Sequence, residues 1–285
     1  MKYECHGHIM ADGVSYAEAA ARHSRAPDET AVRAALCALK EHGVGFFRDG
    51  GDKFGVSLFA KTLAPEYGVD YRTPGFIIHR AGYYGELYGR AYRDIREARE
   101  LIFEAKREKA DFIKIAVSGM LDFASGGLVM GEAIGKDEIR ELTKAARGEG
   151  LCVMAHCNGA ENVKNALEAG VTSLEHGFLT DREGADMLAG TGAVWVPTIA
   201  PVANLLKPGA SGNFSASVLR EILSGHQETL AYARGRGVLI ASGSDCGARG
   251  VAHGTGTDDE IRYLARLGID PSPANARVSE LFRRP

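Results

Sequence analysis

Short apolar runs alternate with longer helical segments along the whole chain, and this alternation constrains the fold more than any other feature. The runs lie at 3–9, 43–49, 75–79, 111–117, 151–156, 171–176, 193–198 and 237–243. The segments between them show helical periodicity, and several end in glycine as helices often do, for example 28–43, 94–110, 136–150 and 217–237. A strand–helix unit repeated eight times predicts an α/β fold of the (β/α)8 barrel type rather than a doubly wound sheet. We expect one barrel domain over residues 1–285.

The composition argues against several classes of partner. The chain has 34 Lys and Arg and 37 Asp and Glu, and this balance lacks the basic surplus of a nucleic-acid binder. No apolar run reaches the roughly 18 residues of a transmembrane helix, and the first ten residues lack a secretory signal. The five cysteines show no CxxC spacing, which suits a reducing compartment. We expect a cytoplasmic protein with a small-molecule substrate, no nucleic acid and no membrane; a homo-oligomer is compatible with the sequence.

Histidines and an aspartate stand where predicted strands end. His6 and His8 flank one glycine on the first strand, so both side chains face the same side and could share a metal ion. Alone, this pair is a weak signal. Three further strands end in metal-ligating residue types: His156, His176 and Asp245. Because barrel active sites lie at the carboxyl-terminal ends of the strands, these residues predict a metal site on that rim.

Lys114 lies in the middle of the fourth apolar run, between Ile113 and Ile115. Its ammonium is therefore expected to point into the barrel, where an unpaired charge is costly. Three interpretations stay open. A neutral amine could react with carbon dioxide to form a carbamate that bridges two metal ions, or form a Schiff base as in barrel aldolases. The stem could also pack in the wall with its head reaching water.

Five short motifs carry a resemblance to a known family: HGH (6–8), FIKI (112–115), AHCNG (155–159), LEHG (174–177) and GSD (243–245). Together they resemble the amidohydrolase superfamily, in particular its binuclear members with a carboxylated lysine. The chain is most similar to the imidazolonepropionase and Xaa-Pro dipeptidase-like branch. The resemblance implies that one metal is held by His6, His8 and Asp245 and the other by His156 and His176, with carboxylated Lys114 bridging both.

The resemblance also implies an activity. Two divalent ions, zinc by preference but with manganese, iron or cobalt open, would activate a hydroxide that hydrolyses an amide, cyclic amide or dipeptide-like C–N bond. Asp245 would take the proton of the hydroxide and deliver it to the leaving nitrogen. The chain departs from the branch in having little sequence for the usual small β-sandwich domain. It also has Glu4 where Asp commonly precedes the first histidine.

Other residues have less specific signals. His79 ends the third run, and we expect it to contact the substrate or to be structural. Tyr83, Tyr84 and His253 lie in loops at the same rim. Each tyrosine is interpreted as a substrate contact or as packing, and His253 as a substrate contact or as a solvated loop residue. Arg48 and Asp49 could form an ion pair with each other. His226, in a polar helical stretch, is expected at the surface. Thr257 and Glu260 together predict a capping box at the start of the helix that follows the eighth run.

Several rival functions use the same residues. A phosphotriesterase- or lactonase-like hydrolase would need the same metals. A deaminase is disfavoured because such enzymes of this superfamily usually work with one metal and lack the bridging lysine. A Schiff-base lyase would need Lys114 free. From a different class, a non-catalytic barrel could keep metal for stability or bind a ligand.

Overall fold

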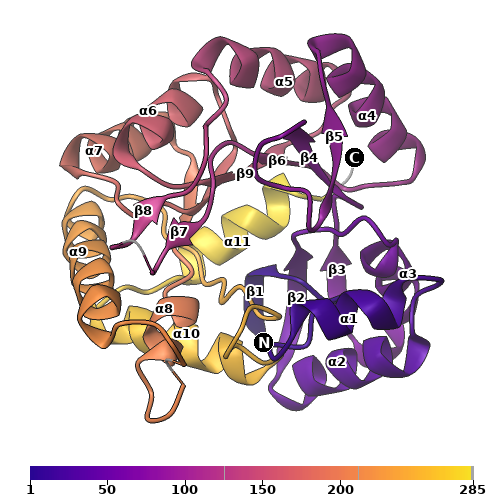
Figure 1. Cartoon of the computed structure of the whole chain (residues 1–285), viewed down its shortest axis with the longest axis horizontal. Helices are drawn as coiled ribbons and strands as arrows, with labels where there is room; N and C mark the ends of the chain where they lie inside the picture. Colours follow the sequence, from indigo (N-terminus) through magenta and orange to yellow (C-terminus); the bar gives the residue numbers. More distant parts are fainter. Residues whose placement is uncertain (125, 211, 284–285) are drawn as a thin grey trace.

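Parallel strands form the centre of the molecule, and helices surround them (Figure 1). The computed structural model describes residues 1–124, 126–210 and 212–283. Its strands are β1 (Lys2–Gly7), β2 (Val44–Asp49), β3 (Asp70–Arg72), β4 (Ile77–Arg80), β5 (Gly89–Tyr92), β6 (Ile113–Ala116), β7 (Leu121–Asp122), β8 (Leu128–Val129), β9 (Val153–Cys157), β10 (Ser173–His176) and β11 (Val194–Val196).

The helices follow the strands in the alternation that the sequence predicts. They are α1 (Tyr16–His23), α2 (Glu29–Glu41), α3 (Val56–Leu63), the 3₁₀ turn η1 (Ala64–Tyr67), α4 (Ile95–Arg107), α5 (Lys136–Gly148), α6 (Ala160–Glu168), α7 (Arg182–Thr191), α8 (Ala200–Leu205), α9 (Ala216–Gly235), α10 (Thr255–Arg266) and α11 (Ser272–Leu281). Aspartates cap three of them, because Asp28, Asp94 and Asp181 each accept a hydrogen bond from a backbone N–H of the first turn. Among the described residues, no helix has both the length and the apolarity that crossing a membrane requires.

Two parallel sheets contain most of the strands. One has the order β1-β2-β3, and the other has the order β11-β10-β9-β6-β4-β5. A separate antiparallel pair, β7-β8, follows β6. Residues 70–80 connect the two sheets: β3 pairs with β2, and β4 pairs with β6. Between these strands, Gly75 O accepts from Asp52 N at 2.9 Å and Thr73 O accepts from Asp111 N at 2.8 Å.

The eighth apolar run, 237–243, lies between β11 and β1 without forming a regular strand. On one side, Trp195 N donates to Leu239 O and Ala241 N donates to Trp195 O. On the other side, Cys5 N donates to Ser242 O at 2.8 Å. Ser242 N donates instead to the side chain of Asn275 in α11 at 2.9 Å, which interrupts the ladder. The eighth run is therefore placed as expected, but the prediction of a full strand there was wrong.

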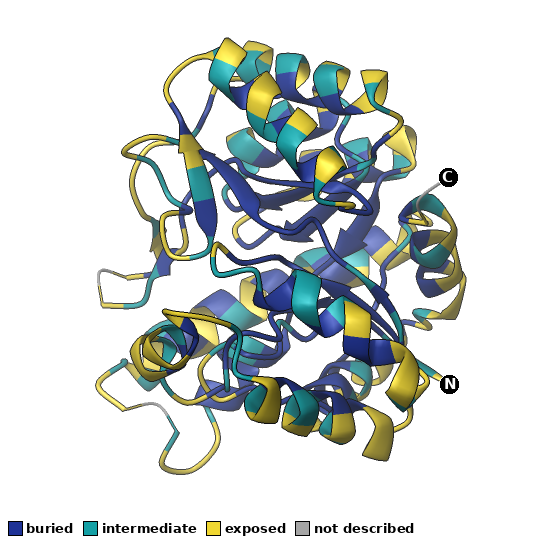
Figure 2. Cartoon of the chain, turned by 90° about the vertical axis from the view of Figure 1, so that its right-hand side faces the viewer, coloured by how far each residue is buried: buried dark blue, intermediate teal, exposed yellow. Residues whose placement is uncertain are grey.

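The core has two layers, which Figure 2 shows as buried strands covered by helices whose outer faces are exposed. The larger apolar cluster lies between strands and helices. The second lies among the interior side chains and includes Cys5, Phe46 and Met154, together with Val278 and Phe282 at the end of the chain. Helix α11, which crosses the middle of Figure 1, thus packs against the strand interior rather than against the outer ring of helices.

Two local predictions from the sequence were wrong. Helix α10 already begins at Thr255, so Thr257 lies inside its first turn and forms no capping box with Glu260. The hydroxyl of Thr257 donates to the Glu4 carboxylate at 2.6 Å, and Glu260 accepts from the backbone N–H of Ile199 and Ala200. His226 is buried instead of exposed, because its ring stacks on Phe178 with 4.0 Å between centroids.

Candidate active site

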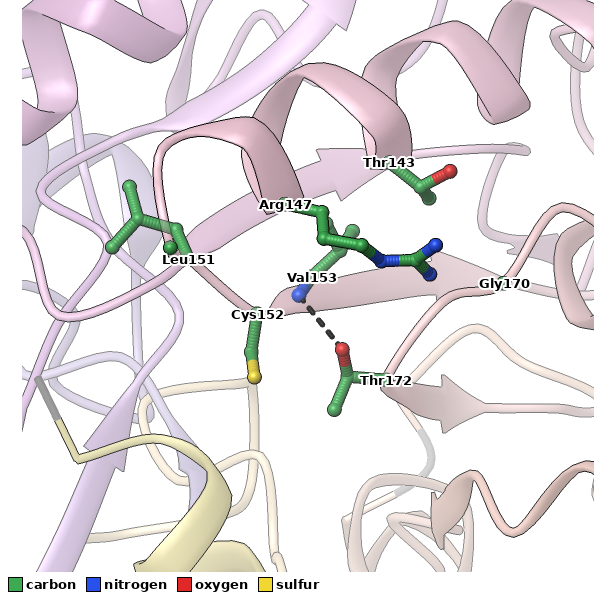
Figure 3. A pocket seen from close by; sticks show the side chains of 8 residues that line it. Thr143, Arg147, Leu151, Cys152, Val153, Gly170 and Thr172 are labelled. Carbon is green, nitrogen blue, oxygen red and sulfur yellow. Dashed lines mark hydrogen bonds between the residues drawn. The ribbon is translucent and has the colours of Figure 1, made fainter. Parts of the chain in front are cut away.

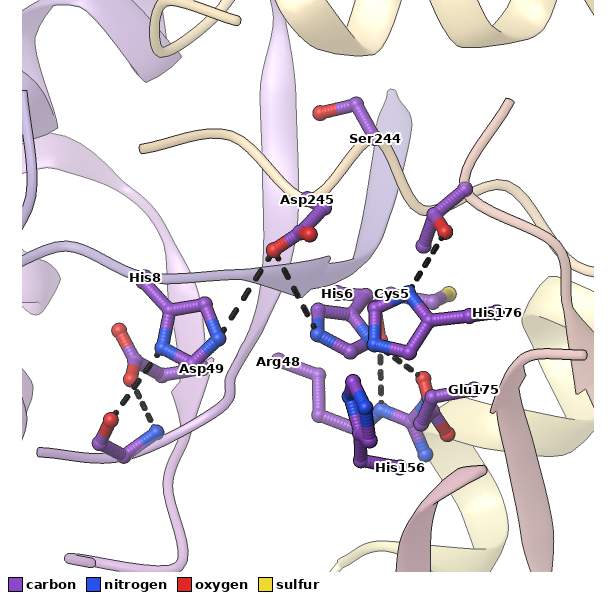
Figure 4. A network of polar contacts seen from close by, with 12 residues as sticks. Cys5, His6, His8, Arg48, Asp49, His156, Glu175, His176, Ser244 and Asp245 are labelled. Atoms are coloured by element: carbon purple, nitrogen blue, oxygen red, sulfur yellow. Dashed lines mark hydrogen bonds and ion pairs between the residues drawn. The ribbon is translucent and has the colours of Figure 1, made fainter. Parts of the chain in front are cut away.

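Five side chains from distant parts of the sequence meet at the carboxyl-terminal ends of the strands (Figure 4). His6 Nε2 lies 3.6 Å and His8 Nε2 lies 3.8 Å from the same carboxylate oxygen of Asp245. The rings of His6 and His176 lie 4.8 Å apart between centroids, and those of His156 and His176 lie 4.4 Å apart. His6, His176 and Asp245 can each offer a ligand atom, and these three atoms lie within 4.8 Å of one another.

Close packing explains the glycine between the first two histidines. A Cβ at Gly7 would lie 2.5 Å from Cys246 Sγ and 2.8 Å from the ring of Phe47. Any larger residue would therefore push β1 away from its neighbours and move both His6 and His8. The register of β1 against β2 also shifts between Glu4 and Gly7, so this end of the strand is irregular where it presents its histidines.

Unusual backbone conformations direct two other members of the site. His176 has φ 67° and Asp245 has φ 55°, and Thr198, which contacts His176, has φ 47°. Non-glycine residues rarely adopt this left-handed region, and each such residue costs about 1–3 kcal/mol. His176 directly follows Glu175, so a regular strand would send their side chains to opposite sides. The left-handed turn at His176 lets both side chains approach His6.

Each histidine is oriented by a hydrogen bond to one ring nitrogen. Nδ1 of His8 lies 3.2 Å from Gly51 O, Nδ1 of His176 lies 2.8 Å from Thr198 Oγ1, and Nδ1 of His6 lies 2.6 Å from Glu175 Oε2. Nε2 of His156 lies 3.3 Å from Gly119 O. Metal-binding histidines in proteins are held in this way, because a fixed partner on one nitrogen sets the tautomer and leaves the other nitrogen free as a ligand.

Burial keeps these imidazoles neutral. Burial first, and the nearby ammonium of Lys114 second, lower the pKa of His8 and of His156 to about 3. The pKa values of His6 and His176 lie well below their usual value, again mainly through burial. Neutral imidazole is the form that binds a metal ion.

The Lys114 ammonium is fully enclosed and has no hydrogen-bond partner among the described residues. Burial lowers the pKa of Lys114 to about 8, so neutral amine is present near neutral pH. His6 Nε2 is likewise buried without a hydrogen-bond partner in the described chain. Orphaned donors and acceptors inside a protein are costly, and their presence beside neutral histidines fits a centre that holds divalent metal ions.

The predicted substrate contacts are placed at varying distances from this centre. The ring of Tyr84 lies 4.5 Å from that of His156, between centroids. His79 is buried, with Nδ1 3.0 Å from Arg80 O and Nε2 3.7 Å from the carboxylate of Glu86. The other two have partners of their own: the Tyr83 hydroxyl donates to Glu132 at 2.6 Å, and His253 Nε2 lies 3.3 Å from the backbone oxygen of His8.

Several residues that contact the site were not predicted from the sequence. The ring of Tyr88 lies 4.4 Å from that of His8, and its only signal was membership of the tyrosine-bearing loop 81–88. Glu175 contacts His6, and its position inside the LEHG motif was the available signal. The expected ion pair of Arg48 with Asp49 was wrong. Adjacent strand residues face opposite sides, so Arg48 pairs with Glu175 while Asp49 accepts from the hydroxyl of Tyr71.

A hollow of about 270 Å³ lies elsewhere, where β9 begins (Figure 3). Arg147 and Cys152 line it, and the hydroxyl of Thr172 accepts a hydrogen bond from Val153 N at 3.0 Å. Val153 is the first residue of β9, whereas His156 stands near its carboxyl-terminal end. The hollow is therefore at the opposite end of this strand from the histidine cluster.

Comparison with known proteins agrees with this geometry. Residues 7–275 match the model of the amidohydrolase family. An uncharacterised protein of Mycobacterium bovis is 31% identical over 139 residues, which are 47% of this chain and 36% of that protein. Ochratoxinase of Aspergillus niger is 25% identical over 220 residues, which are 72% of this chain and 43% of the enzyme. The chain thus spans less than half the length of these curated relatives.

Solved structures show the same fold. A Xaa-Pro dipeptidase with methionine bound in its active site has a TM-score of 0.76 at 24% identity, covering 99% of this chain and 75% of that one. The A. niger ochratoxinase structure also has a TM-score of 0.76, at 20% identity, covering 100% of this chain and 71% of the enzyme. Because the family model matches nearly the whole sequence, the chain belongs to the amidohydrolase family of hydrolytic enzymes.

Proposed function

We propose that this chain is a metal-dependent amidohydrolase that cleaves an amide-type C–N bond of a small molecule, on a closed (β/α)8 barrel. The observation that carries the proposal is the meeting of His6, His176 and Asp245 within 4.8 Å at the strand ends. The hydrogen bonds of residues 239–245 to β11 and β1, and those of residues 70–80 to both sheets, support closure of the barrel. The amide-cleaving or peptide-cleaving names of the structural neighbours support the reaction class.

Two metal ions, zinc by preference, would be held by the neutral imidazoles and by oxygen ligands. His6, His8 and Asp245 would hold one ion, and His156 and His176 the other. When bound, the ions supply a Lewis acid that polarises a carbonyl oxygen and lowers the pKa of water. The fit rests on the orphaned His6 Nε2 and on the hydrogen bonds that leave one nitrogen of each ring free.

Lys114 would supply the bridging ligand as a carbamate. Burial makes its neutral amine accessible near neutral pH, and only the neutral amine reacts with carbon dioxide. The carbamate is an anion, so it would replace an unpaired buried cation by a negative group among metal ligands.

Asp245 would carry the proton in the reaction. In the metal-free protein, burial raises the pKa of Asp245 to about 6. A carboxylate in this position is a residue type that serves as a general acid–base group. Its side chain is 18% exposed, whereas that of His6 is 1% exposed, so the centre opens toward solvent at Asp245. A carboxylate oxygen here can accept a proton during attack on the carbonyl carbon and then donate it to the leaving nitrogen.

Loop 81–88 would shape the substrate pocket. Tyr84 lies against His156 and Tyr88 lies against His8, so aromatic rings from one loop cover both halves of the centre. Burial raises the pKa of both tyrosines further above their ordinary value near 10, so each hydroxyl stays protonated and can donate a hydrogen bond. His79 and His253 remain proposed contacts. One nitrogen of each ring has a backbone partner, and Nε2 of His79 is buried without a hydrogen-bond partner among the described residues.

Metal analysis combined with a substrate panel tests the proposal. We expect two metal ions per chain in the protein prepared with zinc and bicarbonate, and a clear loss of metal in Lys114→Ala. The panel contains dipeptides, N-acyl amino acids, cyclic imides, lactones and phosphotriesters. Hydrolysis of an amide supports the proposal, whereas activity confined to lactones or phosphotriesters would replace it with that alternative. Full metal content in Lys114→Ala would exclude the bridging role, and metal without any hydrolysis would favour a non-catalytic barrel.

A further inference from the structure

We propose that Glu175 and Arg48 form a positioning relay that fixes the ring of His6 and connects helix α11 with the metal centre. The inference deepens the proposed function and rests on it, because its main effect is on metal binding. Neither residue belongs to the predicted ligand set. Both side chains are fully buried inside the strand interior, beside the ligands rather than among them (Figure 4).

Glu175 has every contact that a buried carboxylate needs. Oε2 lies 2.6 Å from Nδ1 of His6, and both oxygens accept from one guanidinium nitrogen of Arg48, at 2.9 and 3.0 Å. The hydroxyl of Ser173 donates to Oε1. A carboxylate paired with a guanidinium is only an acceptor, so Nδ1 of His6 must carry the proton. Nε2 is then left as a lone pair, 3.6 Å from Asp245.

Arg48 is fixed from three further directions. Its Nε donates to the backbone oxygen of Cys5 at 2.7 Å, and Nη1 donates to Ser173 Oγ at 2.9 Å. Its guanidinium carbon lies 4.3 Å from the ring centroid of Phe282, directly after α11, and 6.0 Å from that of Phe112. The planar group is therefore held between hydrogen bonds and an aromatic face, which lysine could not reproduce.

These contacts form one continuous path from α11 through Arg48 and Glu175 to His6. Breaking a buried ion pair by removing one partner is costly, and an apolar pair would be at least as stable in most proteins. A gain in stability therefore does not account for the Arg48–Glu175 ion pair in contact with the proposed ligand His6. Setting the tautomer and direction of a metal-binding ring does give a reason, because partners of this kind change metal affinity about 10–100-fold.

Zinc affinity and the tautomer of His6 test the relay. Glu175→Gln keeps the shape of the side chain but removes its charge, so we expect zinc affinity to fall about 10–100-fold in competition with a chromophoric chelator. We also expect ¹⁵N NMR of the metal-free protein to show loss of the single Nδ1-protonated form of His6. Ser173→Ala, which removes one hydroxyl from the relay without changing charge, should shift both readouts in the same direction by less.

Two controls separate positioning from stability. Glu141→Gln breaks an exposed pair with Arg99 and should leave both readouts unchanged. Ile222→Val lowers stability in a separate apolar cluster that contains neither relay residue, and it should also leave zinc affinity and the tautomer as in the wild type. If Glu175→Gln does not fold, Ser173→Ala decides the question against the same controls.

The outcomes distinguish this inference from the proposed function. If the wild type binds no zinc, the proposed function is wrong, and the His6 tautomer in the metal-free protein still decides whether the relay fixes the ring. If the wild type binds zinc while Glu175→Gln or Ser173→Ala keeps wild-type affinity and the same tautomer, the relay is wrong and the proposed function is unaffected. Losses equal to those of Ile222→Val would also overturn the relay.

Discussion

At the residue scale, the site depends on side chains whose ionisation is set by burial. Neutral histidines, a lysine with a lowered pKa and an aspartate with a raised pKa lie within one small region. Such opposite shifts, from one common cause, are typical of sites that hold metal ions or move protons. Burial alone would be unfavourable for every one of these groups. The arrangement therefore fits the proposed metal centre better than a contribution to stability.

Asp245→Asn should abolish most of the activity while leaving the fold intact. The amide cannot take up the proton, so we expect kcat to fall about 10²–10⁴-fold, the usual contribution of a general acid–base group. Because Asp245 is also a proposed ligand, kcat is to be measured at saturating zinc, with the metal content determined in parallel. Asp186→Asn, at an exposed pair with Arg236, is the matched control. Activity within a factor of ten of the wild type would exclude Asp245 as the proton carrier.

His226 should make the metal-free protein sensitive to mild acid. Burial lowers its pKa to about 4, against about 6.5 in the unfolded chain, so below pH 6.5 the unfolded state binds the proton first. The contribution of His226 is therefore present above pH 6.5 and is lost as the pH falls toward 4.

The measurement is the free energy of unfolding in urea at pH 7 and pH 5. His226→Gln keeps an N–H donor for the carbonyl of Pro197 but does not titrate, so its stability should fall less between the two pH values. The difference between variant and wild type has an upper limit of about 1.4 kcal/mol per pH unit. Identical losses in the two proteins would show that His226 does not titrate on unfolding.

At the element scale, a buried glutamate joins two helices near the site. Glu260 of α10 accepts from the backbone N–H groups of Ile199 and Ala200, where α8 begins, at 3.0 and 2.8 Å. Thr198, next to them, contacts His176. The start of α8 therefore depends on α10 for hydrogen bonds that its own first turn cannot provide.

Glu260→Ala should destabilise the protein through these two backbone groups. Each buried N–H group left without a partner costs about 1–3 kcal/mol, so for the two groups we expect a loss of roughly 2–6 kcal/mol in the free energy of unfolding by urea. Hydrogen exchange should rise first at residues 199–205. Glu280→Ala, on the exposed part of α11, is the control. Unchanged stability and exchange in Glu260→Ala would mean that these hydrogen bonds are dispensable.

The elements also show what the sequence can predict. Long runs such as 111–117 and 151–156 have enough apolar residues to identify β6 and β9. The proposed ligands were predicted from their place at the strand ends, and their role in metal binding stays a prediction. The strands β3 and β5 were missed because their residues, Asp70–Arg72 and Gly89–Tyr92, do not form an apolar run. Tyr88 and Glu175 were missed for another reason: their roles depend on contacts with His8 and His6 across the fold.

At the scale of the whole molecule, the centre ties together strands from both ends of the chain. His6 and His8 come from β1, and Asp245 comes from the segment that lies between β11 and β1. A metal ion held by all of these groups binds only the folded state, so metal binding should stabilise the protein by mass action.

Removing the metal should therefore lower the melting temperature. At a free zinc concentration 1,000 times Kd, the stabilisation is about 4 kcal/mol. We expect a chelator to lower Tm and zinc to restore it, followed by differential scanning calorimetry. Glu141→Gln should respond as the wild type does, whereas Lys114→Ala should respond much less. A Tm that is indifferent to zinc in the wild type would contradict a site formed by both ends of the chain.

The central claim is that Lys114, four histidines and Asp245 hold a pair of metal ions. Anomalous X-ray diffraction at the zinc edge, from crystals grown with zinc and bicarbonate, tests it most directly. The account predicts two anomalous peaks, one beside His6, His8 and Asp245 and one beside His156 and His176, with added density at the end of Lys114 between them. A single peak elsewhere, or an unmodified Lys114 turned away from these residues, would contradict it.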